Sequence, residues 1–120
     1  MYKFYNANSK GKFVNDCVIR AISTATGNSW DYTYNMLSDL AQEQGTMMDD
    51  ANFVRWYLNR YEKVPYLPCT VGEVAGEYPD MTLLITMEGH ITCSIDGVVY
   101  DSFDCRRRRA EDAWIIKKSF

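Results

Sequence analysis

The sequence lacks the residue patterns of a metal protein and of a membrane protein. Its 120 residues include one histidine, and none of its four cysteines lies in the C-x-x-C spacing of zinc ribbons and redox motifs. No segment approaches the roughly 20 consecutive apolar residues that span a bilayer, and the N-terminus has no signal-peptide pattern. We therefore expect no metal, no cofactor, no membrane partner and a cytoplasmic location.

An excess of positive charge is also absent. The formal net charge is −3, so no overall positive field attracts nucleic acid, and a nucleic-acid partner is not expected. The exception is one basic run, Arg106 to Arg109. Because Glu111 and Asp112 follow it closely, the run is typical of a solvated charged loop, and a loop that binds phosphate or nucleic acid is the alternative.

The sequence does contain enough apolar residues for one folded domain. Apolar residues make up 47% of the chain, which is sufficient to bury a core within a single domain over residues 1–120. Local signals divide this domain into a helical half, about residues 15–78, and a β-sheet half, about residues 81–119. The sequence therefore predicts the α+β class, with N-terminal helices packed on a C-terminal antiparallel sheet.

Four helices are expected where apolar residues recur at helical spacing: residues 17–26, 30–44, about 51–61 and about 71–78. Each begins after a residue that can cap a helix: Asn15 or Asp16, Ser29, Asp49 or Asp50, and Thr70 with Glu73 as a capping box. Four strands are expected at residues 82–87, 90–95, 98–103 and 113–118. The Asp96-Gly97 pair predicts a tight hairpin between the second and third strands.

The hairpin predicts which acidic residue lies beside His90. With a two-residue loop, Ile95 pairs with Val98, and Asp101 then projects from the same face of the sheet as His90. Asp101 is a diagonal neighbour of the histidine, within about 7–8 Å between backbone positions. Asp104 projects from the other face. We therefore expect Asp101 to contact the imidazole.

Cys17 is the candidate nucleophile. It lies in the first turn of a predicted helix, where the helix dipole and a nearby protonated histidine both stabilise a thiolate. The other three cysteines lack that setting and are expected to be ordinary free thiols: Cys69, Cys93 and Cys105. A cysteine in a first helical turn is also a common small buried hydrophobe. The prediction therefore depends on the conjunction of Cys17 with His90 and Asp101, the parts of a cysteine nucleophile with its base and orienting acid.

Three segments carry a resemblance to a known family: Asn15-Asp16-Cys17-Val18-Ile19-Arg20-Ala21, Gly89-His90-Ile91-Thr92, and the run from Ile95 to Asp104. They resemble the small papain-like cysteine peptidases of bacteriophages and bacteria, similar to the C39-like peptidase group. The resemblance covers most of the chain from Asn15 to Trp114. It implies a papain-like fold, in which a helix with the nucleophile packs against an antiparallel sheet with the histidine and the acid.

By this resemblance, Cys17 is the nucleophile, His90 the general base and acid, and Asp101 the residue that orients the imidazole. The implied reaction is hydrolysis of a peptide, isopeptide or related amide bond through a thioester acyl-enzyme, with a peptide or protein substrate. Transfer of the acyl group to an amine would use the same site. If the chain is encoded by a phage, the location is the host cytoplasm.

One position departs from the papain-like pattern. These enzymes usually carry a glutamine several residues before the cysteine as an oxyanion donor, and this chain has Gly11 there. The backbone N–H of Cys17 is one available donor, and the Asn15 side chain is the candidate for the other, with helix capping as its alternative role.

An alternative function keeps the fold without efficient turnover. The chain would then be a catalytically weak or inactive papain-like protein that binds a host or viral protein, or nucleic acid through Arg106–Arg109. Reactivity of the Cys17 thiol distinguishes these alternatives.

Overall fold

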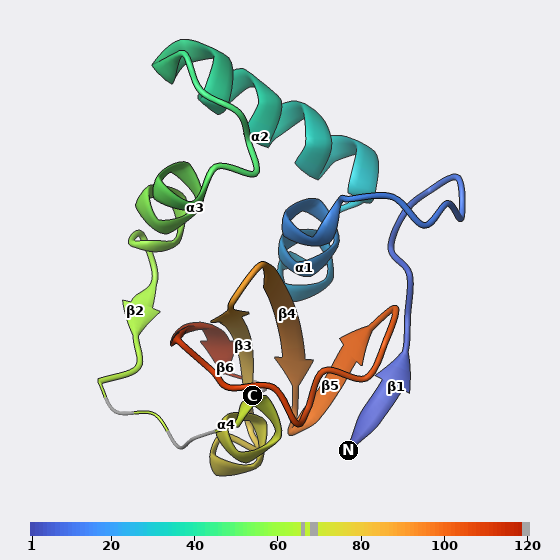
Figure 1. Ribbon diagram of the computed structural model, residues 1–120, viewed down its shortest axis with the longest axis vertical. Helices are drawn as coiled ribbons and strands as arrows, with labels where there is room; N and C mark the ends of the chain where they lie inside the picture. The colour runs from blue at the N-terminus through green and yellow to red at the C-terminus, as the bar shows by residue number, and fades with distance from the viewer. Residues whose placement is uncertain (66, 68–69, 119–120) are drawn as a thin grey trace.

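One mixed sheet of six strands runs through the part of the chain that the structure describes, residues 1–65, 67 and 70–118 of this computed structural model. Its strand order is β1-β5-β4-β3-β6-β2. The strands are β1 Tyr2–Phe4, β2 Glu62–Lys63, β3 Met81–Met87, β4 His90–Ile95, β5 Val98–Asp101 and β6 Asp112–Lys118. The helices are α1 Cys17–Thr26, α2 Trp30–Gln44, α3 Ala51–Leu58 and α4 Val71–Glu77 (Figure 1).

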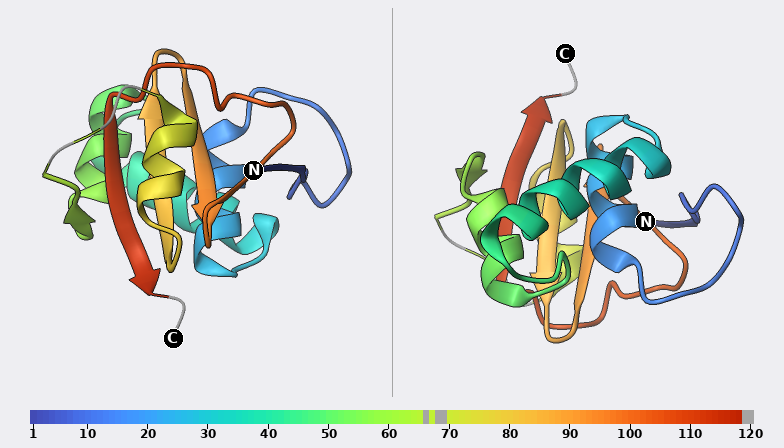
Figure 2. Two further views of the ribbon diagram at one scale, coloured as in Figure 1. Left: turned by 90° about the horizontal axis from the view of Figure 1, so that it is seen from below. Right: turned by 90° about the horizontal axis from the view of Figure 1, so that it is seen from above.

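The helices cover both faces of the sheet. α1, α2 and α3 lie over one face, and α4 lies over the other (Figure 2). Strand β3 contributes to both cores: Leu84 packs under α1 to α3, whereas Leu83 and Ile85 pack under α4. Because successive side chains of a strand point to opposite faces, the continuous apolar run of β3 fills two layers.

Capping side chains set the starts of three helices. Each of these side chains accepts a hydrogen bond from a backbone N–H in the first turn: Ser29 from Tyr32, Asp50 from Phe53 and Thr70 from Glu73. The predicted bounds of α1 and α2 are confirmed, and so is the capping box of α4. α3 ends at Leu58, earlier than predicted, because the next residues form tighter turn hydrogen bonds. None of the described helices is long and apolar enough to cross a membrane.

The predicted hairpin between β4 and β5 is confirmed. Asp96 and Gly97 both have positive φ, 52° and 81°, as a two-residue hairpin loop of this kind requires. Ile95 lies opposite Val98, which is the predicted register. β5 ends at Asp101, earlier than the predicted residue 103, so the pairing does not continue to His90.

Two short edge strands were not predicted, and one of them corrects the prediction of an antiparallel sheet. β1 pairs with β5 in parallel, so the sheet is mixed. β2 pairs with β6 in antiparallel fashion and lies in the half of the chain predicted to be helical, just after the predicted third helix. These strands have three and two residues, too few for the alternation of apolar and polar residues to be recognised in a sequence. The α+β class itself is confirmed.

Candidate active site

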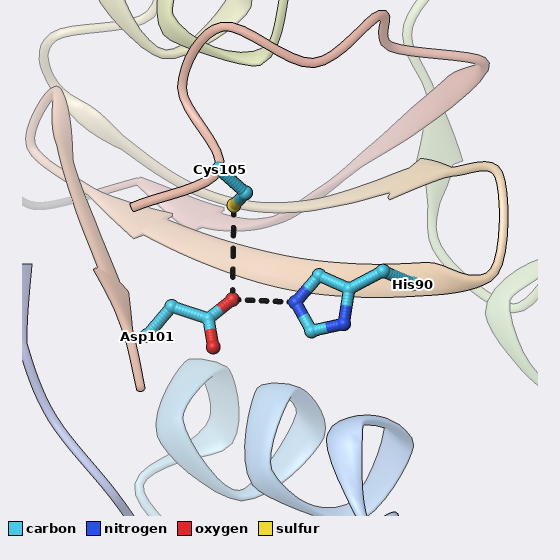
Figure 3. A group of neighbouring side chains, drawn as sticks. All are labelled: His90, Asp101 and Cys105. Atoms are coloured by element: carbon cyan, nitrogen blue, oxygen red, sulfur yellow. Dashed lines mark hydrogen bonds and ion pairs between the residues drawn. The ribbon is translucent and has the colours of Figure 1, made fainter. Parts of the chain in front are cut away.

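His90 and Asp101 meet at one end of the β4–β5 hairpin. His90 begins β4, Asp101 ends β5, and His90 Nε2 lies 2.7 Å from Asp101 Oδ2 (Figure 3). Both side chains are buried, and the Phe103 ring packs on the imidazole with 4.7 Å between ring centroids. The predicted contact between His90 and Asp101 is therefore confirmed. Asp104 instead forms an exposed ion pair with Arg106.

The carboxylate of Asp101 is held through both of its oxygens. Oδ2 faces His90, while Oδ1 accepts hydrogen bonds from Arg20 Nη1 at 2.9 Å and from the Ser102 backbone N–H at 2.7 Å. Burial raises the pKa of Asp101, but the interactions with His90, Thr92 and Arg20 outweigh burial and lower this pKa to about 2. Asp101 is therefore ionised at neutral pH.

Cys17 occupies the first turn of α1 and is half-buried. Burial raises the pKa of its thiol, but several neighbours lower it. The largest of these effects is the hydrogen bond to the His90 side chain, followed by the charge of His90, the Ile91 backbone N–H and the charge of Arg20. Their sum holds the pKa of Cys17 below its ordinary value. The thiolate, which is the nucleophilic form of cysteine, is thus stabilised beside the imidazole.

The pKa of His90 is shifted in the opposite direction from that of Cys17. Burial lowers the pKa of the imidazole, but hydrogen bonds with Asp101, Cys105 and Cys17 and the charge of Asp101 raise this pKa to about 11. Nε2 faces Asp101, and Nδ1 lies on the opposite side of the ring (Figure 3). The pKa of Cys17 is lowered and that of His90 is raised, which are the directions that favour a thiolate paired with an imidazolium.

The start of α1 differs from the prediction. Asp16 is the N-cap residue, but its side chain makes no capping hydrogen bond. Its carboxylate instead accepts hydrogen bonds from Arg20 Nε at 2.8 Å, Trp30 Nε1 at 2.9 Å and Asn8 Nδ2 at 3.1 Å. The prediction that Asp16 or Asn15 caps α1 through its side chain is wrong, because the Asp16 carboxylate accepts hydrogen bonds from side chains outside the first turn instead. The first turn of α1 is left without a side-chain acceptor beside the thiol.

Arg20 is a member of this site that the sequence reasoning missed. It follows Cys17 by about one helical turn, and its guanidinium bridges Asp16 Oδ1 at 2.8 Å and Asp101 Oδ1 at 2.9 Å. The ion pair of Arg20 with Asp16 could be predicted from the local sequence, since the two residues have the i,i+4 spacing of helical ion pairs. The ion pair with Asp101 joins residues 81 positions apart and has no signal in a single sequence.

Cys105 also lies at the site, which corrects the expectation that it lacks a histidine neighbour. Its buried Sγ is 3.7 Å from Asp101 Oδ2 (Figure 3). The ligand atoms of His90, Asp101 and Cys105 lie within 4.8 Å of one another, as in a metal site. Arg20 already donates to the other oxygen of Asp101, which places a cation beside the position that a metal ion would take. We therefore assign no metal to this cluster.

The described cysteines are free thiols, as expected: Cys17, Cys93 and Cys105. Cys69 lies outside the described residues. Cys93 is fully buried in the core under α1 to α3, and burial raises the pKa of its thiol. Cys17 is the only one of the three described thiols that is not fully enclosed.

A hollow of about 260 Å³ opens beside Cys17 and His90, between α1, α3 and the turn that joins β3 to β4. Apolar side chains form much of its lining: Val54, Leu58, Met87 and Trp114. Asn15 is exposed and lies on the wall of the same hollow. The candidate oxyanion donor, the thiol and the imidazole thus border one space.

A second hollow of about 280 Å³ lies on the other side of the start of α1. It shares Asn15, Val18 and Asp49 with the first hollow. Its lining is largely apolar, including Ile19, Trp30 and Met48. Two hollows therefore lie near the start of α1, and of these two only the first is lined by Cys17.

No family model, no curated protein and no solved structure matches this chain. The site nevertheless holds a thiol whose pKa is lowered, an imidazole whose pKa is raised and an ionised acid in contact with that imidazole, with Cys17 and His90 bordering one hollow. These groups are suited to attack on a carbonyl carbon followed by proton transfer to a leaving group.

Proposed function

We propose that this chain is a papain-like cysteine peptidase or related amidase. Its substrate would be a peptide, isopeptide or similar amide bond in a peptide or protein. The observation that carries the proposal is the 2.7 Å contact between His90 and Asp101 beside an open hollow that Cys17, in the first turn of α1, and His90 both line.

The mechanism follows from the protonation states of these groups. The Cys17 thiolate attacks the carbonyl carbon, and the C–S bond forms as the carbonyl oxygen becomes an oxyanion. His90 donates its Nδ1 proton to the leaving amine, the C–N bond breaks and a thioester remains. Neutral His90 then takes a proton from water, which attacks the thioester and releases the acid and the thiolate. Asp101 holds the imidazole through Nε2 in both steps.

The oxyanion would form beside the first turn of α1. The backbone N–H of Cys17 is one donor for it, and the Asn15 side chain on the wall of the hollow is the other.

Selective alkylation tests the nucleophile. At pH 7, iodoacetamide should modify Cys17 well before the other cysteines, as mapped by mass spectrometry of proteolytic fragments. In His90→Ala this selectivity should be lost, because the thiolate loses its hydrogen-bond donor and its counter-charge. Protein unfolded in urea is the matched control, since all four thiols are then equally accessible.

Turnover of an activated ester tests the hydrolase. With p-nitrophenyl acetate, the wild-type protein should form an acetyl thioester on Cys17 and release p-nitrophenol beyond one equivalent. Cys17→Ala should release none above background, and Cys17→Ser should be severely impaired. Equal alkylation of all thiols together with no ester turnover would refute the peptidase proposal and leave the binding protein as the alternative.

The basic run Arg106–Arg109 gives little support to nucleic-acid binding. Arg106 pairs with Asp104, and Arg108 Nη2 donates to the Glu88 carbonyl oxygen. The backbone carbonyls of Arg106 and Arg108 accept hydrogen bonds from the first residues of α4. The run thus has a structural role at α4. A steep salt dependence of binding to DNA or RNA would favour the nucleic-acid alternative instead.

A further inference from the structure

We propose that Arg20 is a positioning residue of this site. Anchored by Asp16, it holds the Asp101 carboxylate in the orientation in which Oδ2 faces His90. Its meaning for catalysis rests on the proposed function, whereas the contacts themselves can be tested without turnover.

The two buried carboxylates around Arg20 have a partner on every oxygen. Asp16 Oδ2 accepts from Trp30 and Asn8, and Asp16 Oδ1 accepts from Arg20 Nε at 2.8 Å. Arg20 Nη1 then donates to Asp101 Oδ1 at 2.9 Å, which leaves Oδ2 for His90 at 2.7 Å. The guanidinium, together with the Ser102 backbone N–H that donates to the same Oδ1 at 2.7 Å, therefore restrains the rotation of the Asp101 carboxylate that would exchange its two oxygens.

Because Arg20 lies on α1, the restraint on Asp101 also affects the position of the Cys17 thiol. Cys17 and Arg20 lie about one turn apart on the same helix, whereas Asp101 ends a strand. The ion pair between Arg20 and Asp101 therefore ties the helix that carries the thiol to the hairpin that carries the imidazole. A planar guanidinium can reach two carboxylates through different nitrogens in a fixed geometry, and the ammonium of a lysine cannot reproduce that geometry.

Arg20 could instead be a buried ion pair that stabilises the fold and does nothing for His90. The two roles predict shifts of opposite sign in the pKa of His90. Removing a nearby positive charge by itself favours the imidazolium and raises the pKa of His90. Losing the restraint on Asp101 weakens the contact between Oδ2 and Nε2 and lowers this pKa. Only the positioning role predicts a fall.

Other charged groups near His90 are unchanged in this comparison. The titratable groups that contact the imidazole are Cys17 from α1, Asp101 from β5 and Cys105 from the segment that follows β5. Tyr2 of β1 lies on the far side of Asp101, and Asp49, Arg55 and Glu111 line the hollow that His90 borders. Each of these groups is present in both the wild-type protein and the Arg20 variants.

The single histidine makes the measurement direct. Its imidazole C–H resonance in a proton NMR spectrum belongs to His90 without further assignment. In the wild-type protein this resonance should keep the shift of the protonated ring to at least pH 9. In Arg20→Met we expect the titration midpoint to fall by at least one pH unit, and in Arg20→Lys by less. Cys17 alkylation at pH 6 should slow in the same order.

Two further outcomes decide the inference. If Arg20→Met does not fold, as judged by circular dichroism, Arg20→Lys decides the question alone, because it keeps the positive charge and loses the planar geometry of the guanidinium. Any fall in its His90 midpoint then reports lost positioning and not lost charge. A midpoint that is unchanged or higher in the folded variants overturns the positioning role. If the midpoint falls as expected but the wild-type protein turns over no ester, the inference stands and the proposed function fails.

Discussion

The starts of α1 and α4 differ in the hydrogen bonds that their backbone N–H groups make. At α4, Thr70 accepts from the Glu73 N–H, and the carbonyls of Arg108 and Arg106 accept from Val71 and Gly72 at 2.9 Å each. At α1 the N-cap side chain makes no such bond. One helix start is closed by its neighbours, and the other has no side-chain cap.

The difference is not a shortage of suitable residues at α1. Asp16 is a good capping residue in the correct position, yet it is turned toward Arg20, Trp30 and Asn8. Its diversion anchors Arg20 and leaves α1 without the side-chain acceptor that α4 has. At α4 the chain instead meets the helix closely, since a Cβ on Gly72 would lie 3.2 Å from Arg106 atoms. Capping hydrogen bonds stabilise the start of α4, whereas the uncapped start of α1 can accommodate negative charge.

The largest effect expected from this difference concerns Asn15. Replacing Asn15 with Ala should lower ester turnover by about 10²–10³, the usual loss when one oxyanion donor is removed. Alkylation of Cys17 by iodoacetamide passes through no oxyanion, so its rate should not change. Comparing the two rates in the same variant separates stabilisation of the oxyanion from activation of the thiolate.

Asn52→Ala is the matched control for Asn15→Ala. Asn52 is also exposed, but it lies on α3 and does not line the hollow. Its turnover should equal that of the wild-type protein. If Asn15→Ala behaves like Asn52→Ala, the open start of α1 needs a different second donor.

A smaller effect concerns the dependence of stability on pH. The raised pKa of His90 stabilises the folded state fully below the unfolded value of about 6.5, and this stabilisation is lost as the pH rises through about 11. In Cys17→Ala, which removes the titrating thiol, the free energy of unfolding should therefore fall from pH 6.5 to pH 9. The slope is at most about 1.4 kcal/mol per pH unit for one proton.

Adding Asp101→Asn to Cys17→Ala should flatten this slope, because the partner that raises the pKa of His90 is gone. The lowered pKa of Asp101 acts with the opposite sign. It stabilises the fold above the unfolded value of about 3.9, and this contribution is lost as the pH falls through about 2. Urea titrations at several pH values measure both branches. Equal slopes between pH 6.5 and 9 would show that His90 is not coupled to Asp101.

Much of the fold could be predicted because its signals are local. Ser29, Asp50 and Thr70 cap helices through residues three positions away, and Asp96-Gly97 sets a hairpin register within six residues. That register was enough to select Asp101 over Asp104 as the partner of His90. A strand of two or three residues such as β1 or β2 carries no comparable pattern.

The missed parts of the site depend on contacts between distant segments. Asp16 was predicted to be a cap on the strength of local preference, and three tertiary hydrogen bonds override that preference. Arg20 meets Asp101 across 81 positions. Cys105 follows the end of β5, where the alternation of a strand no longer tells which way a side chain points. Predicting any of these contacts requires the packing of α1 on the sheet.

The smallest expected effect concerns the capped start of α4. Thr70→Ala removes the side-chain acceptor of α4, and loss of such a cap costs about 0.5–2 kcal/mol. The carbonyls of Arg106 and Arg108 still accept from the first turn, so we expect a loss of about 0.5–1 kcal/mol, near the lower end. The rate of Cys17 alkylation should not change, because α4 lies on the opposite face of the sheet from α1 (Figure 2). Urea denaturation and iodoacetamide kinetics measure the two quantities. A slower alkylation in Thr70→Ala would mean that the two helix starts are coupled through the sheet and are not independent.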